Sequence, residues 1–269
     1  MAPAPASDRL RVGVVKLASC DGCQLTLLDL EDDLLPIAGR FELVEFPEAT
    51  SRRSDGPYDV LLVEGSVSTA DQAEEIVHLR QRSRLLVTIG ACATAGGIQA
   101  LRNAADEPAW RASVYPEPSF VSSLATSTPV AEHVAVDAEL RGCPISPDQL
   151  LELLTALRVG RRPQLSAESV CQGCKRAGIP CVLVGSGMPC LGPVTQAGCG
   201  ALCPAFARGC YGCFGPREEA NVDSLAARFG TERPREEVDR LFAGFTGWAP
   251  PFREASMRTV RRTEEQADA

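Results

Sequence analysis

The sequence is poor in histidine and has no long apolar run. It contains only two histidines, so nothing in it supports a histidine-rich metal site. Its longest apolar runs are too short to span a bilayer. The first residues, MAPAPASDRLRVGVVKL, show neither a charged-then-apolar export signal nor a twin arginine. We therefore expect no membrane span and a cytoplasmic location.

The sequence also lacks an excess of basic residues. Aspartate and glutamate together number 35 against 27 lysines and arginines, which gives a formal net charge of -8. Because phosphate binding needs a basic footprint, we expect no nucleic-acid partner. The 269 residues are enough for one core of about 150 residues and an appended region.

Cysteine is the residue that the chain has in abundance, with twelve in all. Disulfides are rare in the cytoplasm, and this number of cysteines therefore indicates metal ligands rather than cross-links. They divide into three sets of four by position. The sets are Cys20, Cys23, Cys92 and Cys143; Cys171, Cys174, Cys181 and Cys190; and Cys199, Cys203, Cys210 and Cys213.

The first part of the chain alternates short apolar runs with helical patterns, which predicts an α/β fold with a mostly parallel sheet covered on both faces. In such folds the ligand lies at the carboxyl ends of the strands, so the first cysteine set is expected at one sheet edge. Gly90, Gly97 and Gly142 beside these cysteines suit tight turns around a bulky inorganic group. The expected strands are 12–17, 41–46, 59–63, 85–89 and 133–136, and the expected helices are 24–35, 70–82, 93–103 and 147–158.

Two stretches break this alternation. Residues 102–128 have weak periodicity and are expected to form a long surface excursion. After Pro163 the composition changes to cysteine, glycine and proline, and such a segment is expected to depend on metal rather than on a hydrophobic core. We expect two domains, residues 1–165 and residues 166–269, the second including the tail.

The cysteine spacing alone leaves two kinds of site open. A CxxC pair serves zinc and iron-sulfur clusters alike, and Cys92 taken alone also fits a buried structural thiol. Three complete sets in one chain favour three [4Fe-4S] clusters, because clusters close together form a path for electrons. A zinc-stabilised interaction module is the alternative of a different class.

Six sequence blocks together resemble the small, electron-transferring subunit of nickel-iron hydrogenases. In chain order they are SCDGCQLTLLDL, LLVEGSVST, VTIGACATAGGIQALRN, RGCPISPDQLLELL, PCLGPVTQAGCGALC and GCYGCFGP. Within that family the chain looks most similar to the cytoplasmic, cofactor-coupled branch, which includes sulfhydrogenase delta subunits. The resemblance implies a flavodoxin-like parallel sheet domain followed by a cysteine-rich, mostly irregular domain that binds iron-sulfur clusters.

The resemblance also assigns the three cysteine sets, and we use its names for them below. The proximal set is Cys20, Cys23, Cys92 and Cys143; the distal set is Cys171, Cys174, Cys181 and Cys190; the medial set is Cys199, Cys203, Cys210 and Cys213. Exported relatives have histidine at the position of Cys171 and often proline at that of Cys203, so both cysteines favour a full [4Fe-4S] complement. An exchange of Cys190 with Cys199 between the last two sets stays open.

The resemblance implies partners as well. The nickel-iron centre belongs to a large subunit, which this chain does not resemble, and electrons would continue to a flavin and NAD(P)-binding subunit and further iron-sulfur subunits. The iron-sulfur subunit of a complex I-like oxidoreductase is the alternative, although Cys20-Asp21-Gly22-Cys23 and the eight later cysteines count against it. Glu64 has a functional and a structural interpretation. In the first it relays protons or orients a proximal ligand; in the second it is a strand-end carboxylate that caps Gly65 and the following helix.

Overall fold

The computed structural model describes residues 9–30 and 39–256. The first half is built on a parallel sheet of five strands in the order β2-β1-β3-β4-β5, which is the order of flavodoxin-like folds. The predicted α/β class is therefore confirmed. Four strands lie where the sequence predicts them: β1 (Leu10–Lys16), β2 (Phe41–Glu45), β3 (Tyr58–Glu64) and β4 (Ser83–Ile89).

The prediction of a fifth strand at 133–136 is wrong. That stretch follows a 3-10 turn, η3 (Val130–Glu132), and the strand is β5 (Ala138–Leu140). Asp137 explains the shift, because its amide donates to the Leu86 carbonyl and its carboxylate accepts from the Leu86 amide. Pairing with β4 therefore starts only after this residue.

The helices of this half follow the predictions with one interruption. α3 (Ala70–Arg82) and α6 (Pro147–Val159) match. α1 (Gly22–Leu28) ends before the helix expected at 24–35 does, and residues 31–35 of that expectation lie outside the described residues. The helix expected at 93–103 is split into α4 (Gly90–Ala95) and the 3-10 helix η1 (Ile98–Ala104). Gly96 and Gly97 separate them with φ angles of 75° and 65°, which favour glycine.

The sheet has an apolar core on each face. Along β3, Val60 and Leu62 belong to the core shared with α1 and α6, whereas Leu61 and Val63 belong to the core shared with α3. Each of these four side chains is fully buried, which stabilises the fold by about 1.5–3 kcal/mol per residue. Packing on both faces fixes the positions of the strand ends, and it therefore also fixes the loops that carry the proximal set.

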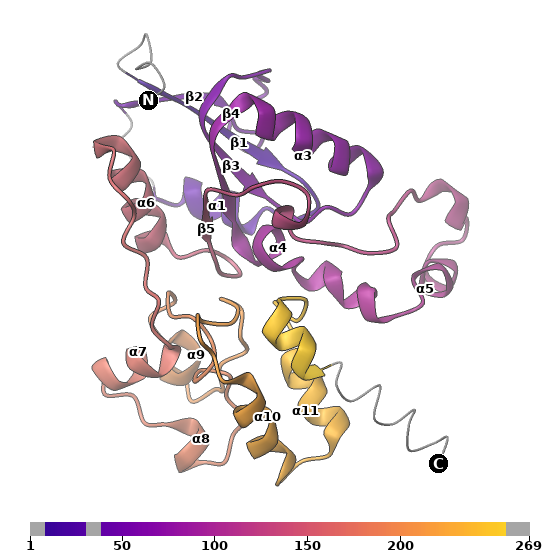
Figure 1. Cartoon of the computed structure of the whole chain (residues 1–269), viewed down its shortest axis with the longest axis vertical. Helices are drawn as coiled ribbons and strands as arrows, with labels where there is room; N and C mark the ends of the chain where they lie inside the picture. Colours follow the sequence, from indigo (N-terminus) through magenta and orange to yellow (C-terminus); the bar gives the residue numbers. More distant parts are fainter. Residues whose placement is uncertain (1–8, 31–38, 257–269) are drawn as a thin grey trace.

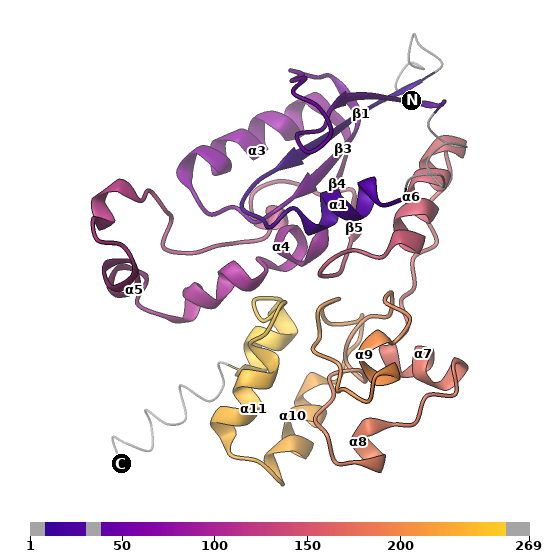
Figure 2. The same cartoon turned by 180° about the vertical axis from the view of Figure 1, so that it is seen from behind.

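The predicted surface excursion at 102–128 is confirmed. It holds α5 (Glu107–Val114) and the 3-10 turn η2 (Pro118–Phe120), and it extends away from the sheet (Figures 1 and 2). Val114 is 68% exposed and Phe120 is 87% exposed, so this arm presents apolar side chains to solvent.

The cysteine-rich half lies below the sheet domain, on the side of α4 and opposite to α3 (Figure 1). It contains three short helices, α7 (Val170–Arg176), α8 (Val182–Gly185) and α9 (Leu202–Ala205). Three of its eight cysteines lie in α7 and α9, and the others lie in the turns and loops around these helices. α10 (Val222–Gly230) and α11 (Arg235–Phe242) follow, and residues 250–256 are also helical. Among the described helices none has the length and apolar character needed to cross a membrane.

The expectation that only the first domain has a hydrophobic core is wrong. Leu191 and Val194 from the cysteine-rich segment pack with Phe229 of α10, Phe242 of α11 and Phe252. The rings of Phe242 and Phe252 meet edge to face, with centroids 5.7 Å apart. The second half is therefore stabilised by an apolar core as well as by any metal that it holds.

Candidate metal centres

The proximal set gathers at the carboxyl edge of the sheet. Cys20 follows β1, Cys23 lies in α1, Cys92 lies in α4 and Cys143 follows β5. Burial raises the pKa of the Cys92 thiol to about 11, and neighbouring Cys143 and Cys20 add to that rise. Burial also raises the pKa of the Cys23 thiol, and nearby Cys92 and Cys143 add to that rise. These mutual effects mean that the four thiols share one small region.

Glycines make the space around these thiols. A Cβ atom at Gly90 would lie 2.4 Å from the Sγ of Cys23, and one at Gly97 would lie 2.6 Å from the Sγ of Cys92. Any larger residue at either position would displace a thiol. The all-sulfur donor set and these glycine-lined recesses fit an iron-sulfur cluster.

Glu64 supports the helix that carries Cys23. Its carboxylate is 2% exposed and accepts hydrogen bonds from the Cys23 amide at 3.1 Å and from Nε2 of Gln24 at 2.9 Å. The reading of Glu64 as a cap of the next helix is wrong, because Thr69 caps α3 by accepting from the Gln72 amide. Burial raises the pKa of Glu64, and the two hydrogen bonds oppose that rise.

Gln99 is a supporting residue that the sequence reasoning missed. Its Oε1 accepts from the Sγ of Cys92 at 3.5 Å, and its Nε2 donates to the Ala18 carbonyl at 2.8 Å. It therefore links the Cys92 loop to the loop before Cys20. The sequence could have indicated this role, because Gln99 lies two residues after Gly97 and the Gly96-Gly97 pair turns the chain back toward Cys92.

The distal set is also brought together. Cys171 and Cys174 lie in α7, and Cys181 directly precedes α8. Cys190 lies in the loop that follows α8, and its side chain is buried. Burial raises the pKa of the Cys171 thiol to about 11, and Cys190, Cys174 and Cys181 follow as the next causes. All four residues that the sequence assigns to this set are thus near one another.

The medial set lies against both other sets. Burial raises the pKa of the Cys213 thiol to about 11, with Cys199, Cys143 and Cys203 as further neighbours that raise it. Cys143 belongs to the proximal set, so the medial set adjoins the proximal one at this point. Burial raises the pKa of the Cys210 thiol to about 12, and nearby Cys190 belongs to the distal set. Cys213 therefore lies near a cysteine of the proximal set, and Cys210 lies near a cysteine of the distal set.

Phe214 packs between the two domains at this junction. A Cβ atom at Gly142 would lie 2.7 Å from its ring, and one at Gly198 would lie 2.3 Å from it. The ring is only 3% exposed. Because Gly142 precedes Cys143 and Gly198 precedes Cys199, Phe214 fixes how the proximal and medial sets approach each other.

In the described part of the chain, no three histidine, cysteine, aspartate or glutamate side chains converge tightly enough to hold a single metal ion.

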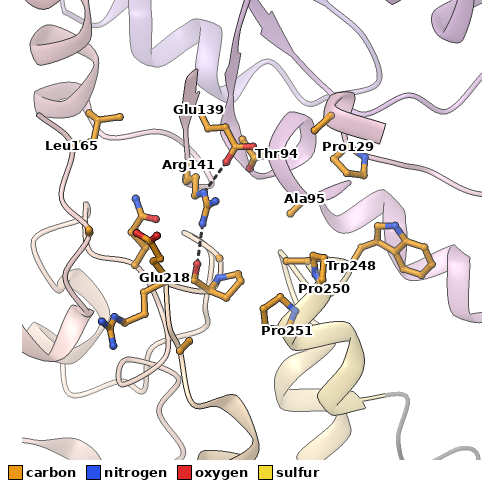
Figure 3. Close-up of a pocket in the computed structure, with 18 of the residues that line it drawn as sticks. Thr94, Ala95, Pro129, Glu139, Arg141, Leu165, Glu218, Trp248, Pro250 and Pro251 are labelled. Carbon is orange, nitrogen blue, oxygen red and sulfur yellow. Dashed lines mark hydrogen bonds and ion pairs between the residues drawn. The ribbon is translucent and has the colours of Figure 1, made fainter. Parts of the chain in front are cut away.

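A groove of about 840 Å³ separates the two domains at another place (Figure 3). Thr94 and Arg141 line it from the sheet domain, and Glu218 and Trp248 line it from the second domain. Arg141 forms an ion pair with Glu139 at 2.9 Å and donates to the Pro216 carbonyl at 2.8 Å. The groove is lined by none of the twelve cysteines, so Arg141 joins the domains without belonging to a thiol site.

Comparison with known proteins places the chain in a family. The family model described as NADH ubiquinone oxidoreductase, 20 Kd subunit, matches residues 20–157. Over 239 residues the chain is 37% identical to sulfhydrogenase 2 subunit delta of Pyrococcus furiosus, with 89% of this chain and 100% of that relative covered.

Solved structures agree with this placement. A chain of an NAD+-reducing [NiFe]-hydrogenase in the H2-reduced state matches with a TM-score of 0.54 and 30% identity, covering 58% of this chain and 95% of that chain. A chain of the actinobacterial-type NiFe-hydrogenase from Ralstonia eutropha H16 covers 99% of this chain and 93% of its own length, with a TM-score of 0.55. At 19% identity the second match shows the fold alone. This chain therefore belongs to the family of the NADH ubiquinone oxidoreductase 20 Kd subunit, and within it to the relatives of hydrogenase small subunits.

Proposed function

We propose that the chain is the electron-transfer subunit of a nickel-iron hydrogenase whose catalytic centre lies in a partner large subunit. Three [4Fe-4S] clusters, held by the proximal, medial and distal sets, would connect that centre to a flavin and NAD(P)-binding partner. The observation that carries the proposal is the arrangement of the sets: the Cys210 amide donates to the Sγ of Cys190, and Phe214, which follows Cys213, packs against Gly142, which precedes Cys143. A [4Fe-4S] cluster bound by four thiolates takes up and releases one electron at a time.

The protein's own residues have three tasks in this function. The cysteines supply thiolates, and because burial keeps several of their pKa values above the ordinary one, metal binding must release protons. Glu64 orients the start of α1 by accepting from the Cys23 amide, and Gln99 holds the loop before Cys20 by donating to the Ala18 carbonyl. Phe214 excludes water at the junction of the proximal and medial sets.

The exposure of the proximal edge supports a large partner there. Cys20 and Cys143 are exposed in this chain, whereas Cys23 is buried. Apolar side chains surround that edge: Leu25 is 48% exposed and Ile98 is 52% exposed. The α5 arm adds Phe120, and an interface that is apolar at its centre is typical of obligate complexes. We propose that the large subunit covers this edge and the arm.

Two alternatives stay testable. The family description favours a complex I-like oxidoreductase, but the family match ends at residue 157, before the eight cysteines of the distal and medial sets. A zinc-stabilised module is the other alternative. The cytoplasm stays the proposed compartment, because so many free cysteines suit a reducing environment.

Anaerobic analysis of the chain purified with its large subunit tests the proposal. We expect about twelve iron and twelve sulfide for this chain and no zinc, together with hydrogen-dependent reduction of a viologen dye by the complex. The chain alone should bind no nickel and reduce no dye with hydrogen. Stoichiometric zinc, about eight iron, or hydrogen oxidation by the chain alone would contradict it.

A further inference from the structure

The contact between the two domains is incompletely filled beside the proximal and medial sets. The groove of about 840 Å³ is lined by Arg141 from the sheet domain and by Pro216 from the second domain. Another hollow, of about 310 Å³, is lined by Gln149 and Ala197. The buried ring of Phe214 packs at the same junction. The side chains that cross this junction therefore have a large influence on how the domains meet.

Arg141 connects the loop of the proximal set to the loop of the medial set. Its Nη1 donates to the Pro216 carbonyl at 2.8 Å, and its Nε donates to Glu139 at 2.9 Å, which orients the guanidinium (Figure 3). Arg141 lies two residues before Cys143, and Pro216 lies three residues after Cys213. Hydrogen bonds from a charged donor are stronger than those between neutral groups. A strong bond thus joins the two sets within a few residues of a cysteine in each.

Gln149 makes a second connection of the same kind. Its Nε2 donates to the Ala197 carbonyl at 3.4 Å, and it lies in α6, which follows Cys143 in the chain. Ala197 lies two residues before Cys199 of the medial set. A Cβ atom at Gly198 would lie 2.9 Å from this Nε2, so the glycine allows the close approach. Because its hydrogen bond is longer, Gln149 makes the weaker of the two connections.

The two acceptor carbonyls belong to one bridged unit of the second domain. Thr195 and Pro216 form an isolated antiparallel bridge. Further backbone hydrogen bonds of 3.0 and 2.9 Å join residues 194–196 to residues 215–217. The segment that leads into the medial set and the segment that leaves it are therefore held together, and the sheet domain contacts both.

The donor side is anchored in the sheet domain. Arg141 directly follows β5, and the next carbonyl, that of Gly142, accepts from the Ala91 amide at 2.7 Å. Ala91 precedes Cys92, so this bond also fixes the loop of another proximal cysteine. Since both ends of the Arg141 connection are anchored, this connection helps to set the separation of the proximal and medial sets.

Electron transfer between two clusters falls off exponentially with the distance between them, so this separation bears directly on the rate. We propose that Arg141, assisted by Gln149, is a positioning residue for electron transfer between the proximal and medial sites. The inference rests on the proposed function and adds residues to it that bind no cluster. Neither side chain exchanges an electron. They hold the two sites at a fixed separation while one site is oxidised by one electron and the other is reduced by one.

The magnetic interaction between the reduced proximal and medial sites tests this proposal, in the anaerobic complex with the large subunit. Electron paramagnetic resonance should show a weaker and more widely distributed interaction in R141M/Q149M than in the wild type, because the separation of two paramagnetic centres sets its strength. After a pulse of hydrogen and rapid freezing, the medial site should be reduced severalfold more slowly in this variant. R141K keeps the charge and a donor, and it should retain most of the wild-type interaction.

The matched control is R217M. Arg217 lines the same groove, but its Nε forms no hydrogen bond with any residue that the structure describes. Loss of its charge should lower the potentials of nearby sites, as loss of Arg141 does, because a positive charge favours the reduced cluster. The magnetic interaction in R217M should nevertheless keep its wild-type strength. The interaction, unlike the potentials, therefore reports on position rather than on charge.

An interaction in R141M/Q149M equal to that of the wild type, at full iron content, would overturn the proposal, and so would an equal loss in R217M. Should the double variant lose iron, E139Q decides, because it keeps Arg141 but removes its ion pair. A weaker interaction in E139Q supports the proposal, and an unchanged one overturns it. Metal analysis of the wild-type complex reports on the proposed function separately, since zinc in place of iron would contradict that function before any variant is compared.

Discussion

The backbone N–H of Cys210 donates a 3.2 Å hydrogen bond to the Sγ atom of Cys190. The two residues belong to different sets in our assignment, so this bond marks the boundary between the medial and distal sites. Hydrogen bonds to sulfur help to set the reduction potential of an iron-sulfur cluster. The potentials of the two sites should therefore be coupled through this contact.

The assignment of Cys190 can be decided by comparing single and double variants. If Cys190 and Cys171 hold the same cluster, C171A, C190A and C171A/C190A should each affect the signal of one cluster, and the double variant should lose at most about four iron. If they hold different clusters, the double variant should affect two clusters and lose up to about eight iron. C199A combined with C213A provides the matched pair for the medial set. Iron analysis and electron paramagnetic resonance of the anaerobic complex give the answer, and a loss of about eight iron in C171A/C190A would mean that Cys190 and Cys199 exchange places.

Cys203→Pro should convert the medial site to a [3Fe-4S] cluster of higher potential. Cys203 lies in the first turn of α9, where amides have no helical partner, and Pro204 already follows it, so proline should fit there. The oxidised complex should gain a [3Fe-4S] resonance while the other two sites stay unchanged. A spectrum identical to the wild type would remove Cys203 from the ligands.

Gly198→Ala should destabilise the protein through Phe214. The new methyl group would overlap the Phe214 ring, and overpacking of this kind costs about 1–3 kcal/mol. Gly198 has no positive φ angle, so the clash is the main cause. Phe214→Leu should relieve it, and G198A/F214L should be more stable than the sum of the two single changes predicts. Urea unfolding of the complex measures this, and simple additivity would show that Phe214 is not the obstacle.

Glu64→Leu should weaken the proximal site far more than Glu64→Gln. Leucine leaves the Cys23 amide and the Gln24 side chain without their buried acceptor, at a cost of about 1–3 kcal/mol for each unpaired group. Glutamine keeps one acceptor oxygen, and Gln24 can turn its amide to match. Unfolding free energy and iron retention should follow that order. Equal loss of hydrogen oxidation in both variants, with full iron content, would instead support the proton relay.

Glu152→Gln should remove a pH-dependent contribution to stability at the segment that joins the domains. The Glu152 carboxylate accepts from Arg161 at 2.6 Å and from the Gln164 amide at 2.6 Å. These bonds, Arg161 first, lower its pKa to about 2. A lowered pKa stabilises the fold above the ordinary value of 4.5, and the effect is lost as the pH falls toward 2.

The metal-free chain is the right sample for this comparison, because acid would otherwise release the metal. The wild type should unfold at a higher urea concentration than E152Q at pH 7, and the difference between the two midpoints should shrink below pH 4.5 and vanish only near pH 2. A difference that stays constant with pH would assign the effect to packing rather than to the carboxylate charge.

The sheet domain could be predicted from the sequence because its local patterns and its packing agree. The helix 70–82 shows this agreement: Thr69 caps it, and Ile76 faces the core. The wrong position predicted for the fifth strand also has a physical cause. Val134 and Val136 are apolar because they pack against the core from a loop, while the pairing residues Ala138–Leu140 are too few to give a pattern of their own.

The second core could not be predicted, because its residues come from distant places. Leu191 and Val194 are isolated among glycine, proline and cysteine, and they find partners only in the helices after residue 221. Phe214 was missed for a similar reason, since its partners Gly142 and Gly198 lie in different domains. The positions of the cysteines need no such knowledge, which is why three candidate sets could be proposed from the sequence.

The late position of that second core has a consequence for how the protein is made. The sheet can form while the chain is still leaving the ribosome, since domains fold in the order of their synthesis. Leu191 and Val194 must wait until Phe242 and Phe252 have emerged, and the Thr246 hydroxyl closes the arrangement by donating to the Gly212 carbonyl at 2.7 Å. The segment that carries the medial and distal sets therefore completes its apolar core only after residue 252 has left the ribosome.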